Sequence, residues 1–161
     1  MPRRLRPDQI EFGRGAPEPA VAAWAELIEE GTGWMNLMPE VEEEDAAAVT
    51  PSPVAAIFRA PGPPIPQVTL MAPTTGRRGD KPAQLGLTHG VGTRVVPRLA
   101  AEEIHLPPGW TVVQDHVRRG VVLKLADPVD AAWTVGWALK AAEVLCPIPV
   151  TGAWLAEVHR P

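Results

Sequence analysis

Four side chains that could do chemistry follow one another closely at a polar break between two alternating apolar stretches. They are Asp115, His116, Arg118 and Arg119. Two arginines can fork onto a carboxylate or a phosphate, and an imidazole beside them could move a proton if a substrate came within hydrogen-bond reach. Charged residues at a turn are also typical of a solvated hairpin tip, where they contribute little to stability. A ligand or partner contact is therefore the functional hypothesis, with a solvated tip as the alternative.

A second candidate is the glycine-containing stretch after an expected strand, which includes His89, Gly90 and Gly92. The backbone N–H groups at the start of a helix bind anions, and a short helix is expected here, capped by Thr93 or begun by Pro97. A tight turn explains the two glycines equally well. An anion site and a tight turn therefore both remain as interpretations of these three residues.

The usual catalytic signatures are missing from the chain. Ser52 is the only serine and lies between two prolines, which excludes the Gly-x-Ser-x-Gly elbow of hydrolases. Cys146 is the only cysteine, which excludes an intrachain disulfide and every Cys-x-x-Cys motif. The acidic run from 40 to 45 lacks the spacing and the central glycine of a calcium loop. We therefore name no catalytic residue, no cofactor and no metal ligand, and we expect a protein that is not an enzyme.

Length and charge narrow the class of protein further. The chain has 161 residues and a net charge of −4, so we expect one domain (17–161) after a flexible basic arm (1–16), and nucleic acid is an unlikely partner. No apolar run approaches the roughly 20 residues of a membrane span. The basic start is not followed by an apolar segment, so no signal peptide is expected. These features together favour the cytoplasm.

The elements around the polar break are the clearest in the chain. Period-two alternation over 110–126 predicts an antiparallel hairpin. Asp127 as N-cap and Pro128 in the first turn predict a helix that ends before the prolines at 147 and 149. Its apolar residues fall on two opposite faces, and the second face carries Trp133, Trp137 and Val144. Either an amphipathic helix over 17–30 covers these tryptophans, or a dimer or another partner does.

The predicted order of elements from residue 83 is strand, helix, strand, strand, helix, strand. This βαββαβ order is the split pattern of ferredoxin-like folds, so we predict an α+β fold with such a core over 83–159. Two proline-bordered strands, 54–59 and 67–72, are expected to extend the mainly antiparallel sheet at its edge. The N-terminal helix completes the fold.

Four segments carry a resemblance to known proteins: GTGWMNLMPEVEEED, LGLTHGVG, LPPGWTVVQDHVRRGVV and LCPIPVTGAW. Together they resemble a small actinobacterial protein family of unknown function, over residues 17–161. The resemblance implies no activity and no ligand. The second apolar face of the helix and the missing catalytic motifs lead us to expect a non-enzymatic interaction or accessory module with a protein partner or a second copy of itself. The alternative is a small anionic-ligand-binding protein or an enzyme with a pocket between sheet and helices.

Overall fold

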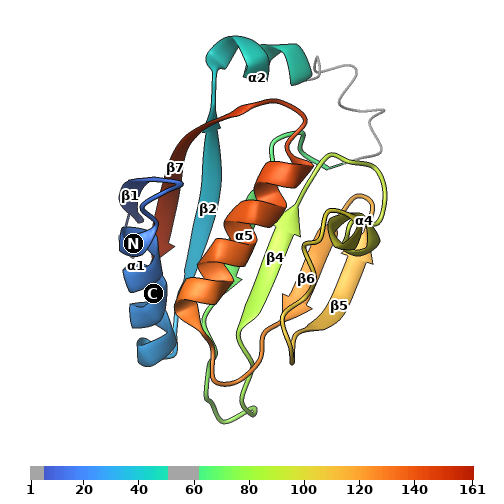
Figure 1. Cartoon of the computed structure of the whole chain (residues 1–161). Helices are drawn as coiled ribbons and strands as arrows, with labels where there is room; N and C mark the ends of the chain where they lie inside the picture. Colours follow the sequence, from blue (N-terminus) through green and yellow to red (C-terminus); the bar gives the residue numbers. More distant parts are fainter. Residues whose placement is uncertain (1–5, 51–61) are drawn as a thin grey trace, which may run out of the picture.

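The computed structural model describes residues 6–50 and 62–161. They form an α+β structure with a seven-stranded antiparallel sheet, and α1, α4 and α5 lie on one face of it (Figure 1). The strands are β1 (Asp8–Gly13), β2 (Trp34–Val41), β3 (Gln67–Met71), β4 (Gln84–Thr88), β5 (Thr111–His116), β6 (Gly120–Lys124) and β7 (Val150–His159). The helices are α1 (Glu18–Glu30), α2 (Glu43–Val49), α4 (Val96–Ala101) and α5 (Ala131–Leu145). No helix in these described ranges is long and apolar enough to cross a membrane.

The sheet is broader than the predicted core. From β4 onward the elements follow the predicted βαββαβ order, and β6 lies between β4 and β5 as the split pattern requires. The full order is β1-β7-β2-β3-β4-β6-β5, so β2 and β3 separate β4 from β7, which would be neighbours in a ferredoxin-like core. The predicted α+β class and antiparallel sheet are therefore confirmed at this coarser level.

The central position of β3 differs from the edge position expected of it. Pro66 precedes β3, so every residue of the strand keeps its N–H group, and β3 pairs with β2 on one side and β4 on the other. The sequence did not reveal β2, because its alternation runs into Pro39 and then into acidic residues that begin α2. The other predicted strand, 54–59, lies outside the described residues.

The N-terminal segment is also more ordered than expected from 1–16 as a flexible arm. Residues 8–13 form β1, which pairs with β7 in antiparallel register from Asp8 opposite Val158 to Gly13 opposite Ala153. Phe12 is buried and Ile10 packs against the core, which ties this edge strand down. Arg160, just after β7, adds ion pairs to Asp8 at 2.9 Å and to Glu26 of α1 at 2.8 Å.

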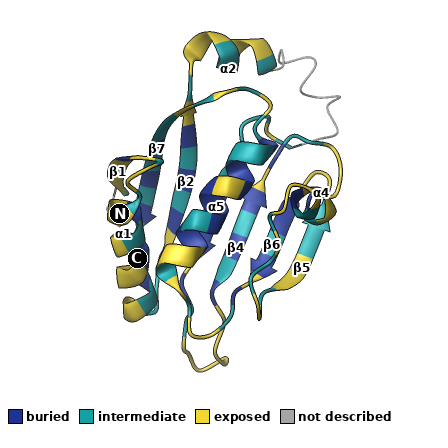
Figure 2. Cartoon of the chain, in the orientation of Figure 1, coloured by how far each residue is buried: buried dark blue, intermediate teal, exposed yellow. Residues whose placement is uncertain are grey.

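The hydrophobic core lies between the sheet and the helices (Figure 2). α1 occupies nearly the predicted range and buries Trp24 and Leu27. α5 lies next to it across the middle of the sheet and buries Leu139, while β7 contributes Trp154. Each central strand buries alternate residues on this face, so the sheet has one covered face and one open face.

The start of α5 is three residues later than predicted, and its cap is Asp130, not Asp127. The Asp130 carboxylate accepts a hydrogen bond from the backbone N–H of Trp133 at 2.9 Å. This satisfies one of the N–H groups that have no partner in the first turn. Asp127 and Pro128 belong to the connection that leads from β6 into the helix.

Candidate functional site

Two of the four candidate groups at the hairpin tip hold the local fold together. The Asp115 carboxylate accepts hydrogen bonds from the backbone N–H groups of Val95 and Val96, each at 3.0 Å, and so caps the start of α4. His116 Nδ1 accepts from the backbone N–H groups of Arg118 and Arg119, at 3.0 and 3.2 Å. An acceptor nitrogen carries no proton, so this contact requires the neutral ring with its proton on Nε2.

Arg118 and Arg119 themselves are exposed, and neither forms an ion pair within the described residues. The turn between them and β6 depends on Gly120, which has a positive φ of 81°. A Cβ at Gly120 would collide with the backbone oxygen of Leu87 in the next strand. The tip therefore combines a constrained backbone with two solvated guanidinium groups, and its four side chains do not converge on one point.

His89 is fully buried at the end of β4. Burial lowers the pKa of its imidazole below the ordinary value; the negative charge of Asp115 opposes this effect and the positive charge of Arg98 adds to it. Its Nδ1 accepts from the backbone N–H of Val91 at 3.3 Å, while Nε2 has no hydrogen-bond partner among the residues that the structure describes. The ring is therefore held neutral inside the protein.

Local backbone geometry explains why glycines stand beside His89. A Cβ at Gly90 would approach the backbone of Pro63 and Pro64 to 2.9 Å, and Gly92 has a positive φ of 77°. The N–H groups at the start of α4, where we considered an anion, already bind the Asp115 carboxylate. An anion site at His89, Gly90 and Gly92 stays a prediction, but these N–H groups already have an acceptor.

The two α5 tryptophans have different surroundings. Trp137 is 6% exposed, its Nε1 donates to the backbone oxygen of His105 at 2.9 Å, and its ring meets Trp110 edge-on at 5.3 Å between centroids. Trp133, one turn earlier, is 58% exposed.

The prediction that the N-terminal helix covers both tryptophans is therefore wrong, because the segment 103–108 covers Trp137 instead. α1 packs along another side of α5, where Arg14, just before it, pairs with Glu143 at 2.9 Å. Val144, the third interface candidate, is half-buried and packs against the core.

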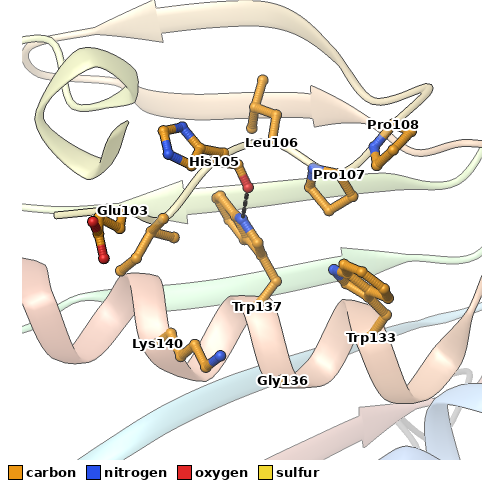
Figure 3. Close-up of a pocket in the computed structure, with 10 residues that line it drawn as sticks. Glu103, His105, Leu106, Pro107, Pro108, Trp133, Gly136, Trp137 and Lys140 are labelled. Carbon is orange, nitrogen blue, oxygen red and sulfur yellow. Dashed lines mark hydrogen bonds between the residues drawn. The ribbon is translucent and has the colours of Figure 1, made fainter. Parts of the chain in front are cut away.

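The space beside Trp133 is a groove, which we call the Trp133 groove. A cavity of about 450 Å³ lies between α5 and the segment 103–108. A smaller one of about 140 Å³ adjoins it, and the two share Trp133, Pro107 and Pro108. Figure 3 shows both indoles rising from α5 toward the segment 103–108, with Lys140 further along the helix. Gly136 leaves the floor open, because nothing lies within 4 Å of where its Cβ would be.

The sequence contained the groove's residues but not their arrangement. Helical periodicity places Trp133 and Trp137 on one apolar face, whereas Pro107 and Pro108 lie in the connection that precedes the hairpin. A proline pair at that distance from α5 in the sequence carries no signal of which helix face it will lie against. Within the described ranges, no group of three or more His, Cys, Asp or Glu side chains is placed to hold a metal ion.

Comparison of this chain with models of protein families, with curated proteins and with solved structures finds no match. The function of the protein is therefore inferred from the geometry of the site.

Proposed function

We propose that this protein is a non-enzymatic accessory module that binds an extended, proline-containing segment of a partner protein in the Trp133 groove. One observation carries the proposal. The chain itself already lays a segment with two prolines, 103–108, against Trp137, whose indole N–H donates to the backbone oxygen of His105 in that segment. Trp133 offers the same chemical groups one helical turn away, with most of its surface still exposed.

The chemistry of the groove suits this ligand. Proline-rich segments adopt a preformed extended helix without internal hydrogen bonds, so they lose little entropy on binding and leave their carbonyl groups free. Aromatic-lined grooves recognise them by packing rings against prolines and donating to those carbonyls. The indole N–H of Trp133 makes no hydrogen bond within the described residues and could serve as such a donor. Lys140 and Glu103 at one end of the groove could select a flanking charge.

The hairpin tip supports an accessory role more than a catalytic one, since the Asp115 and His116 side chains accept hydrogen bonds from backbone N–H groups. Arg118 and Arg119 would then form a secondary contact with the partner. We further propose that the elements from β4 to β7 are a ferredoxin-like core whose sheet is widened by β2 and β3, and that the protein acts in the cytoplasm. The likeness to an actinobacterial family stays a prediction.

The test uses defined peptides with alternating or paired prolines and a proline-free peptide of the same length, titrated by calorimetry. The wild-type protein should bind some proline-containing peptides saturably, and Trp133→Ala should weaken that binding by about thirty-fold or more, as expected when an interface anchor worth about 2 kcal/mol is truncated. Trp34→Ala removes another exposed tryptophan, on the opposite face of the sheet, and should bind as the wild type does.

Two outcomes would contradict the proposal. One is a folded wild-type protein that prefers no proline-containing peptide over the proline-free one. The other is equal binding by the Trp133→Ala and Trp34→Ala variants.

A further inference from the structure

The face of the sheet turned away from α1, α4 and α5 has no cover among the described residues. Its side chains come from alternate positions of all seven strands, and each is partly or fully exposed. The same strands bury their other side completely under the helices at Met35, Leu70, Leu85 and Leu123. We call this surface the open face.

The open face carries large apolar groups on its middle strands, chiefly toward one end of these strands. Met71 of β3 is 50% exposed and Trp34 of β2 is 40% exposed, and these two residues are paired across the strands. Trp34 also stacks on the His159 ring, with centroids 4.7 Å apart and planes 8° from parallel. Met38 and Leu155, another cross-strand pair on this side, extend the apolar surface. Exposed apolar residues gathered on one flat surface mark a contact with another molecule.

The charges on the open face are divided between its two ends. Glu11 of β1 and Glu157 of β7 lie at one end, and Lys124 of β6 lies at the other, together with Arg118 and Arg119 of the hairpin tip. β3 is the middle strand, with three strands on each side. Rotating a second copy by half a turn about an axis parallel to β3, between two facing sheets, would lay the acidic end of each copy over the basic end of the other.

We propose that the open face is the seam of a homodimer in which two copies pack sheet against sheet around this axis. Met71 would meet Met71 of the second copy at the axis. Glu11 lies in the same cross-strand row as Leu155, Met38 and His116, so it would face the His116 end of the other copy. A symmetric dimer requires such a self-complementary patch.

The size of the face also fits this partner. Seven strands at about 4.8 Å spacing and five residues at about 3.3 Å each give a face of roughly 30 by 17 Å. The projected area is thus about 500 Å², and the accessible area is larger because side chains protrude, which brings it toward the roughly 800 Å² per partner of a standard stable interface. Nucleic acid suits the face less well, because its acidic end would repel phosphates.

The proposed dimer does not require peptide binding in the Trp133 groove, but dimerisation would raise the affinity for some partners. The Trp133 groove lies on the helix side, so both grooves would point outward and remain accessible. A partner with two proline-containing segments could then bind both copies and gain from the high effective concentration of the second site.

The first test compares two exposed apolar residues on opposite faces, by light scattering after gel filtration and by sedimentation equilibrium. The wild type should have twice the mass of the chain. Met71→Lys places two like charges at the axis and should raise the dimer dissociation constant more than about tenfold. Trp133→Lys should leave the dimer intact. Melting curves show that each variant is folded, which is expected because both side chains are exposed.

The second test examines the orientation of the two copies. Under the proposed axis Lys124 lies over the cross-strand row that ends at His159, and Glu157 lies in the next row of the same strand. A lysine side chain is long enough to reach such a diagonal neighbour. Lys124→Glu should therefore weaken the dimer, and adding Glu157→Lys should restore it. A wild-type protein that stays monomeric up to its solubility limit would overturn the proposal. So would dissociation by Trp133→Lys without an effect of Met71→Lys, which would place the seam on the helix side. Failure of the charge exchange to restore the dimer would overturn the proposed axis.

Discussion

Trp133 and Trp137 project from the same stripe of α5, one turn apart, and they have opposite roles. The segment 103–108 buries Trp137, binds its N–H and leaves it in contact with Trp110. The same segment passes Trp133 at its two prolines and leaves its ring largely in solvent. Helical periodicity assigns both residues to one face, but the cover of that face ends between them. Burial on a helix is therefore decided by what lies against each turn.

The strongest test of this contrast is the stability of the two alanine variants. Trp137→Ala removes a buried ring and leaves a cavity, so it should lower the free energy of unfolding by about 3–5 kcal/mol. Trp133→Ala removes a side chain that is already mostly in solvent and should change that free energy by less than about 1 kcal/mol. Urea unfolding followed by circular dichroism measures both. Similar losses in the two variants would mean that the burial difference does not exist in solution.

The sequence predicted which helices and strands exist better than it predicted which strands pair with one another. The hairpin, the N-terminal helix and the last strand were found because each has a strong period of its own. The place of β3 between β2 and β4 was not found, because pairing partners far apart in the chain leave no mark on local alternation. The same limit applies to the site. Trp133 could be named from its face of the helix, but Pro107 and Pro108 become groove walls only through the path of the chain between α4 and β5.

The hairpin region offers a second, smaller contrast, between aspartates that bind backbone N–H groups and one that does not. Asp115→Ala removes the acceptor of two N–H groups at the start of α4 and should lower stability by about 1–2 kcal/mol. Asp130→Ala removes the cap of α5 and should cost about 1 kcal/mol. Asp127→Ala is the matched control, because Asp127 is exposed and caps no helix. Thermal melts of the three variants would contradict the assignment if Asp127→Ala cost as much as Asp115→Ala.

The smallest predicted effect is a pH dependence of the free energy of unfolding, which distinguishes the buried His89 from an exposed histidine. The pKa of His89 is lowered in the folded protein from its ordinary value of 6.5, chiefly by burial. Between the lowered pKa and 6.5 the unfolded chain binds more protons at this residue than the folded one, so stability rises with pH across that window. The contribution of neutral His89 is therefore complete above 6.5 and is lost as the pH falls below it, at no more than about 1.4 kcal/mol per pH unit.

His89→Gln should remove this dependence, whatever its effect on stability at neutral pH. His105→Gln is the control, since His105 is exposed and supplies only its backbone oxygen to Trp137. Urea unfolding of each variant at several pH values between 5 and 8 gives the slopes. A His89→Gln variant that keeps the wild-type slope below pH 6.5 would show that His89 takes up its proton as readily in the folded protein as in the unfolded chain. The burial of its ring would then be looser than the structure has it.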